Sequence, residues 1–192
     1  MAAKIHRMPT NPLVPVLLLL SVLAPTSIWS QQYHLVGAPE VYTLVNLHPD
    51  EGRQRLYSVN YQLQGFIPLC TRVVIESVTS KEMKFSLAEG ARRYAYFFHE
   101  TLRDPIPKHL DRYFGAKCDK SQIQRMSKVD QEGILAGRAL PGMTKDAVIL
   151  AIGYPPEHAT PSLESNLWRY WKNRWGTMLV HFDGGKVARV QN

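Results

Sequence analysis

Hydrophobic and polar residues alternate in short runs between residues 33 and 118, which is the pattern of β-strands with one buried face. The alternation is clearest at residues 84–87, and the β-branched run at residues 73–75 also favours a sheet. Five segments follow this pattern: YTLVNL, RLYSVNYQLQ, TRVVIESV, KEMKFSL and RRYAYFFH. One short helix, PIPKHLDRYFG, comes after them. We therefore predict a small β-rich module with one short helix over residues 31–118, folded as a compact antiparallel sheet or an SH3-like barrel.

After residue 118 a polar stretch, KCDKSQIQRMSK, leads into segments with helical spacing. The stretch DQEGILAG predicts one short helix, with Asp130 as its N-terminal cap. The stretch PGMTKDAVILAIGYPPE predicts a second helix, which Thr144 caps and which Gly153 and Pro155 end. SNLWRYWKN, GTMLVHFDG and KVARVQN then alternate as strands do. We therefore predict an α+β domain over residues 119–192, in which a two-helix layer covers a three-stranded antiparallel sheet.

The N-terminal residues 1–30 have the features of a secretory signal peptide. Lys4 and Arg7 precede an apolar run at residues 13–24, and the small polar stretch TSIWS follows it. Cleavage is expected after Ser30 or Ser27. The apolar run is short for a membrane-spanning helix, and no cysteine follows it to carry the lipid of a bacterial lipoprotein. We expect an exported protein without a lipid anchor, in the periplasm or on the periplasmic face of the outer membrane.

The charge of the chain narrows the class of partner. The formal net charge is +7, and it becomes +5 once Lys4 and Arg7 leave with the signal peptide. Positive and negative residues are interspersed rather than grouped, so a nucleic-acid partner is not predicted. A modest positive field favours an acidic protein or anionic lipid head groups, although ordinary solubility accounts for it as well.

Two cysteines, Cys70 and Cys118, are the only ones in the chain. Export places them in an oxidising compartment, where disulfides form and persist. We therefore predict a disulfide between them. Two buried free thiols are the alternative, since sequence does not show whether their geometry allows a bond. Two cysteines without further ligands at suitable spacing do not predict a metal site.

Short motifs in the last third of the chain occur in a fixed order. They are carried by Gly142, Met143, Thr144, Val148, Gly153, Pro155, Trp168, Tyr170 and Phe182. Over about residues 129–192 this order resembles the SmpA/OmlA family, the BamE-like proteins of Gram-negative bacteria. The resemblance implies a two-helix, three-strand sandwich, a periplasmic location and a non-enzymatic accessory role in inserting β-barrel proteins into the outer membrane. The chain departs from that family in lacking the lipid-bearing cysteine and in having about ninety residues before the matching part.

The stretch LWRYWKNRW contains the candidate partner surface. In a strand, Trp168 and Tyr170 point to one side and Arg169 and Trp171 to the other. Because tryptophan beside arginine is common in protein interfaces, we predict that Arg169, Trp171 and Arg174 contact a partner. Ordinary packing of the tryptophans, with the cations lying over them, is the alternative.

Sequence motifs of catalysis do not occur: the chain has no GxSxG, HExxH, GxxxxGK[ST] or CxxC pattern, and its histidines are scattered. We therefore expect no enzyme, no catalytic residues, no cofactor and no metal. The sequence favours an interaction module of the bacterial envelope, with outer-membrane barrel assembly components as candidate partners. A secreted inhibitor-like or cell-wall-binding envelope protein is the alternative.

Overall fold

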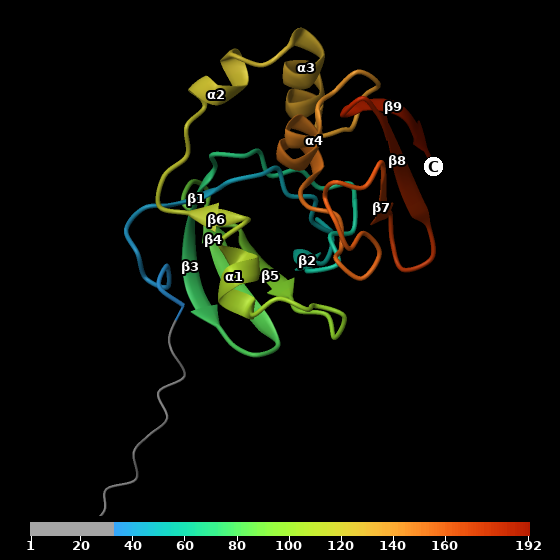
Figure 1. Cartoon of the computed structure of the whole chain (residues 1–192). Coiled ribbons are helices and arrows are strands. Elements are labelled where there is room, and N and C mark those ends of the chain that lie inside the picture. Colours follow the sequence, from blue (N-terminus) through green and yellow to red (C-terminus); the bar gives the residue numbers. More distant parts are fainter. Residues whose placement is uncertain (1–32) are drawn as a thin grey trace, which may run out of the picture. The chain divides into compact units, whose positions relative to one another are not determined.

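The computed structural model describes residues 33–192, so the predicted signal peptide lies outside the described residues. The described residues belong to one compact unit, Gln31–Asn192, which consists mainly of strands (Figure 1). Within this part of the chain, no helix is both long enough and apolar enough to cross a membrane.

A six-stranded sheet, in the order β2-β5-β4-β3-β1-β6, is the larger of two sheets. Its strands are β1 (Val41–Thr43), β2 (Arg55–Tyr57), β3 (Arg72–Val78), β4 (Glu82–Leu87), β5 (Arg93–Phe97) and β6 (Phe114–Gly115). Neighbouring strands are antiparallel except for β2 and β5, which run parallel. The sheet is therefore mixed.

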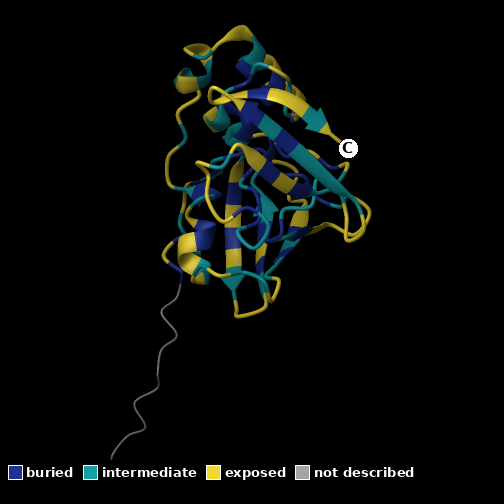
Figure 2. Ribbon diagram, turned by 45° about the vertical axis from the view of Figure 1, so that its right-hand side comes forward, coloured by how far each residue is buried: buried dark blue, intermediate teal, exposed yellow. Residues whose placement is uncertain are grey.

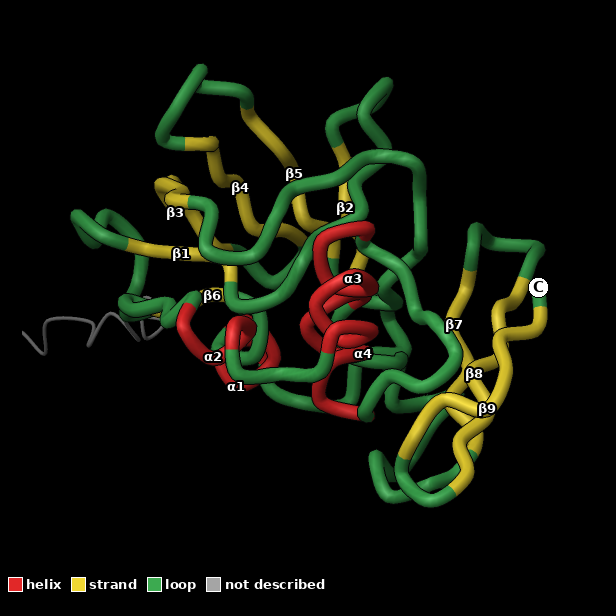
Figure 3. The backbone as a smooth tube through the Cα atoms, turned by 90° about the horizontal axis from the view of Figure 1, so that it is seen from above, coloured by secondary structure: helices red, strands yellow, loops and turns green. Residues whose placement is uncertain are grey.

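The second sheet is an antiparallel meander, and the helices are short. The meander consists of β7 (Leu167–Trp171), β8 (Thr177–Asp183) and β9 (Lys186–Gln191). The helices are α1 (Ile106–Leu110), α2 (Ser121–Gln124), α3 (Lys128–Ala136) and α4 (Lys145–Ile152). In the view from above, α3 and α4 lie between the first sheet and β7–β9 (Figure 3).

The fold class expected from the sequence is wrong. Strand residues outnumber helical residues in the described part of the chain, and its largest element is a six-stranded mixed sheet rather than a two-helix layer on a three-stranded sheet. The parallel pair of β2 and β5 also departs from the antiparallel or SH3-like module predicted for the first part. Alternation indicates which side chains face the core, but it does not say which strands are neighbours. A parallel pair needs a long connection, and residues 58–92, which include β3 and β4, provide it.

Two clusters of buried side chains form the hydrophobic core. Large members of the first, which lies on the six-stranded sheet and α1, are Ile75, Met83, Phe85, Tyr96, Leu110 and Phe114. The second joins α3 and α4 to β7–β9 through Ile134, Met143, Val148, Ile152, Trp168, Tyr170 and Val180. Buried and exposed residues alternate along the strands (Figure 2). Ile149 of α4 packs against both clusters, so this helix connects the two parts of the core.

Asp130 joins the N-termini of α3 and α4. Its buried carboxylate accepts hydrogen bonds from Ser127 Oγ at 2.7 Å and from the backbone N of Thr144 at 2.8 Å. The predicted capping role of Thr144 is confirmed, because its side chain accepts a hydrogen bond from the backbone N of Ala147. The predicted cap of the first helix is wrong, since Ser127 occupies that position. Ser127 has the extended backbone and the accepting side chain of a cap, whereas Asp130 lies within the first turn of α3.

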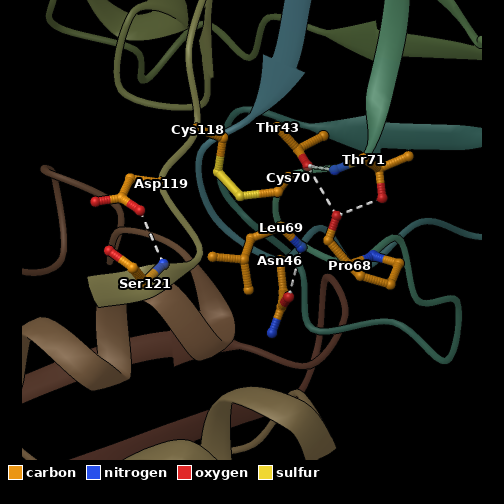
Figure 4. Close-up of a disulfide and its surroundings, with 9 residues drawn as sticks. All are labelled: Thr43, Asn46, Pro68, Leu69, Cys70, Thr71, Cys118, Asp119 and Ser121. Carbon is orange, nitrogen blue, oxygen red and sulfur yellow. Dashed lines mark hydrogen bonds between the residues drawn. A yellow bond between two sulfur atoms is a disulfide. The ribbon is translucent and has the colours of Figure 1, made fainter. Parts of the chain in front are cut away.

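Cys70 and Cys118 form the predicted disulfide, with their Cα atoms 5.4 Å apart and a sequence separation of 48 (Figure 4). The bond ties the loop before β3 to the segment after β6. The backbone N of Cys70 also donates to the carbonyl of Thr43 at 2.7 Å, which fixes the loop to β1. A disulfide is consistent with an exported protein, because cytosolic thiols are usually kept reduced.

Candidate functional site: an arginine–aromatic groove

The segment after β2 is hydrogen-bonded to the C-terminal part of the chain. The backbone N of Gln62 donates to the carbonyl of Trp171 at 2.7 Å, which places Tyr61 beside the end of β7. The side chain of Asn60 donates to two carbonyls at the C-terminal end of α4, at 2.8 Å each. Gly153 has φ of 75°, and a Cβ at this position would lie 2.9 Å from Asn60 Nδ2. Glycine therefore both adopts this backbone conformation and leaves room for the contact.

The turn between β7 and β8 presents an exposed tryptophan. The side-chain oxygen of Asn173 accepts hydrogen bonds from the backbone N atoms of Trp175 and Gly176, at 2.8 and 2.9 Å. The backbone N of Lys172 donates to the carbonyl of Gly176 at 2.8 Å and closes the turn. Trp175 remains 81% exposed. Tryptophan is among the residues most enriched in protein interfaces, so this turn is a candidate contact site.

A groove of about 650 Å³ lies between this turn and the segment around β2. We call it the arginine–aromatic groove, and its defining side chains are Arg53, Arg55, Tyr57, Tyr61, Arg174 and Trp175. Its volume is within the range of several hundred cubic ångströms that is typical of ligand-binding clefts.

The groove has an excess of positive charge, because its three arginines outnumber its one carboxylate, that of Asp50. Arg53 pairs with Asp50, at 3.3 Å between Nη1 and Oδ2. Within residues 33–192, neither Arg55 nor Arg174 has a carboxylate oxygen within 4.0 Å. Burial raises the pKa of Tyr61, and the positive charge of Arg174 opposes that rise. Two guanidinium groups are therefore available to an anionic ligand.

Aromatic rings support both of these guanidinium groups. The Cζ atom of Arg174 lies 5.0 Å from the ring centroid of Trp175, and that of Arg55 lies 5.3 Å from the ring centroid of Phe97. Tyr57 stacks on the same phenylalanine, with centroids 5.8 Å apart. A guanidinium group held over a ring keeps its N–H groups for a planar acceptor such as a carboxylate. The groove thus offers oriented charged donors beside aromatic surface.

The three predicted partner residues differ in their relation to the groove. Only Arg174 lines the groove. Arg169 is exposed on β7, and its backbone N donates to Thr160 Oγ1 at 2.9 Å. Trp171 is half-buried and stacks on His158, with ring centroids 6.4 Å apart. The Nε1 atom of Trp171 is buried and has no acceptor among the described residues.

Sequence reasoning missed the part of the groove that comes from the first module. Arg55 and Tyr57 are two residues apart in a strand, so their side chains lie on the same face, opposite the buried Leu56. That spacing was the available signal. It did not show that Arg174 and Trp175, more than a hundred residues later, would complete the site.

The residues that carry the family resemblance build the second core. Six of them are buried there or pack at its edge: Met143, Val148, Gly153, Trp168, Tyr170 and Phe182. The hydroxyl of Tyr170 donates to the carbonyl of Gly153 at 3.0 Å, which ties the sheet to the end of α4. Gly142, Thr144 and Pro155 occupy the turn before α4, its cap and the segment after it. Their roles in the described structure are therefore packing and chain reversal.

A buried histidine lies outside the groove. His109 of α1 is 4% exposed, and its Nε2 atom is 2.8 Å from the hydroxyl of Tyr96. Burial lowers the pKa of His109 to about 4, and the nearby Arg112 contributes in the same direction, whereas Asp104 opposes it. The histidine is therefore neutral at pH 7. Within the described residues, no group of three or more His, Cys, Asp or Glu side chains could hold a metal ion.

His109 makes stability depend on pH. In the unfolded chain a histidine titrates near pH 6.5, so the unfolded state binds more protons than the folded state between about pH 4 and pH 6.5. Stability is complete above this window and falls as the pH decreases through it. We expect the free energy of unfolding to fall by about 2 kcal/mol through this group between about pH 7 and pH 5. Urea unfolding at both pH values checks this.

The matched variant for this test is His109→Gln, which keeps a polar side chain but does not titrate in the window. It should lose the part of the pH dependence due to His109, whereas His34→Gln, at an exposed histidine, should retain it. Equal pH dependence in wild type and His109→Gln would show that the buried histidine is not responsible.

Comparison with known proteins gave no relatives. No family model matches the chain, and neither the curated proteins nor the solved structures contain a match.

Proposed function

We propose that this protein is an exported, non-enzymatic interaction module that holds a protein partner of the cell envelope in the arginine–aromatic groove. The observation that carries the proposal is the combination, in one groove, of two ring-supported arginines with a tryptophan that is 81% exposed. Tryptophan, tyrosine and arginine are the residues that most often dominate binding energy in protein interfaces.

The proposed location is the periplasm, or the periplasmic face of the outer membrane, without a lipid anchor. The disulfide and the signal-peptide features of residues 1–30 support export. The ordered motifs that resemble the SmpA/OmlA family support an outer-membrane partner, and barrel assembly components are the first candidates. Anionic lipid head groups and cell-wall polymers are the competing partners.

Crosslinking in the envelope followed by mass spectrometry tests the proposal. The wild-type chain should recover one or more envelope proteins. The double variant Arg174→Ala/Trp175→Ala should recover at least about tenfold less of these proteins. Each removed side chain is of the type that forms interface hot spots. Both side chains are exposed, so the fold should not change.

The control is Lys186→Ala/Arg189→Ala, which removes two exposed cationic side chains from β9. It should recover partners at the wild-type level. Equal recovery by the groove variant and the wild type would contradict the proposal, and so would sedimentation with cell-wall sacculi in place of any protein partner.

A further inference from the structure

We infer that the arginine–aromatic groove recognises an acidic polypeptide segment in which two carboxylates flank an aromatic or other apolar side chain. The inference rests on the proposed function and names the chemistry of the partner. Its basis is that Arg55 and Arg174 both line the groove, and that neither has a carboxylate oxygen within 4.0 Å among the described residues.

Each guanidinium group has its own supporting ring. Arg55 lies over Phe97, at the end of the six-stranded sheet, whereas Arg174 lies over Trp175 in the β7–β8 turn. Two carboxylates on one ligand can meet both arginines where they are, each through a paired N–H···O contact.

The remaining lining of the groove favours an apolar group on the ligand. Tyr57, Tyr61 and Leu63 also line the groove, and Tyr57 and Tyr61 meet edge to face with centroids 5.2 Å apart. The faces of such rings pack well against an apolar side chain and, being partly negative, do not attract a carboxylate. A segment that combines acidic and apolar residues therefore matches both kinds of side chain that line the groove.

Charge and shape favour a peptide over a membrane or a polyanionic glycan. Because Asp50 pairs with Arg53, the excess charge of the groove is that of two guanidinium groups, which matches a ligand with a few carboxylates rather than a densely anionic surface or glycan. The site is concave, whereas a lipid surface is contacted by a flat or protruding patch.

Isothermal titration calorimetry with the mature chain tests the inference. The probe is a short acetylated peptide that alternates glutamate and phenylalanine, and its control has glutamine at each glutamate position. The acidic peptide should bind at least about tenfold more tightly than the glutamine peptide, and added salt should weaken it. Arg55→Gln/Arg174→Gln should abolish this difference, whereas the charge-matched Lys186→Gln/Arg189→Gln should preserve it.

Equal affinity for the two peptides would overturn the inference, and so would an acidic peptide that binds the Arg55→Gln/Arg174→Gln variant as tightly as the wild type. Binding of phosphatidylglycerol vesicles or of polygalacturonate through the two arginines, without peptide binding, would overturn it as well. Envelope crosslinking separates these failures from failure of the proposed function. A protein partner that is lost with Arg174→Ala/Trp175→Ala would leave the proposed function standing even if the acidic peptide did not bind.

Discussion

Replacing both Cys70 and Cys118 with serine should lower the free energy of unfolding by about 4 kcal/mol. The disulfide closes a loop with a sequence separation of 48, and a loop of this size removes that much chain entropy from the unfolded state. The loop contains β3, β4, β5 and α1, so most of the first core lies inside it. Urea unfolding of the oxidised wild type and of the double variant measures the difference.

Reduction provides a control for this prediction, because it breaks the bond without changing the sequence. The wild type should become as unstable in a reductant as the serine variant, and the serine variant itself should not respond to the reductant. A difference below about 1 kcal/mol between oxidised and reduced wild type would mean that the bond constrains the unfolded chain little.

Local structure was predictable from the sequence where short-range chemistry determines it. Thr144 begins α4 because its side chain accepts a hydrogen bond three residues ahead, and proline stops the helix soon after it ends. The alternation in LWRYW likewise separates the buried Trp168 and Tyr170 from the exposed Arg169. In each case the cause lies within a few residues of the effect.

The order of strands was not predictable in the same way. The segment RLYSVNYQLQ shows that Leu56 faces a core, but it contains no signal that β2 pairs with β5 in parallel. The resemblance covers only residues 129–192, whereas the larger sheet lies in the first part of the chain. Pairing depends on contacts between distant segments, which a hydrophobic pattern does not encode.

For the same reason, only one of the two groups of residues that form the groove could be predicted from the sequence. Arg174 stood out because it lies in a stretch rich in tryptophan and arginine. Its counterpart Arg55 reaches the same groove because the backbone of Gln62 bonds to that of Trp171, across more than a hundred residues. A binding site assembled by one such long-range contact leaves only its separate halves in the sequence.

Asn46→Ala should lower the free energy of unfolding by about 3 kcal/mol, because it removes three buried hydrogen bonds and leaves the backbone N of Leu69 without an acceptor. Asn46 is 1% exposed. Its Nδ2 atom donates to the carbonyls of Ile134 in α3 and Ala151 in α4, at 2.7 and 3.1 Å. Its Oδ1 atom accepts from the backbone N of Leu69 at 2.8 Å (Figure 4). One side chain thus connects two helices with the loop that carries Cys70.

Urea unfolding measures the loss, with Asn166→Ala as the control, since Asn166 is exposed and only its backbone carbonyl is bonded to β8. That control should change stability by less than about 0.5 kcal/mol. If Asn46→Ala changed stability as little, the three hydrogen bonds of Asn46 would not contribute as expected.

Asn46→Asp separates lost hydrogen bonding from lost volume. Aspartate has the size of asparagine and keeps an oxygen for Leu69, but its second oxygen would face the carbonyls of Ile134 and Ala151, where a donor is required. If hydrogen bonding dominates, Asn46→Asp should be at least as destabilising at pH 7 as Asn46→Ala, although it creates no cavity. It should recover part of the loss near pH 4, where a protonated carboxyl can again donate. A milder effect of aspartate than of alanine at pH 7 would instead assign the contribution of Asn46 to packing.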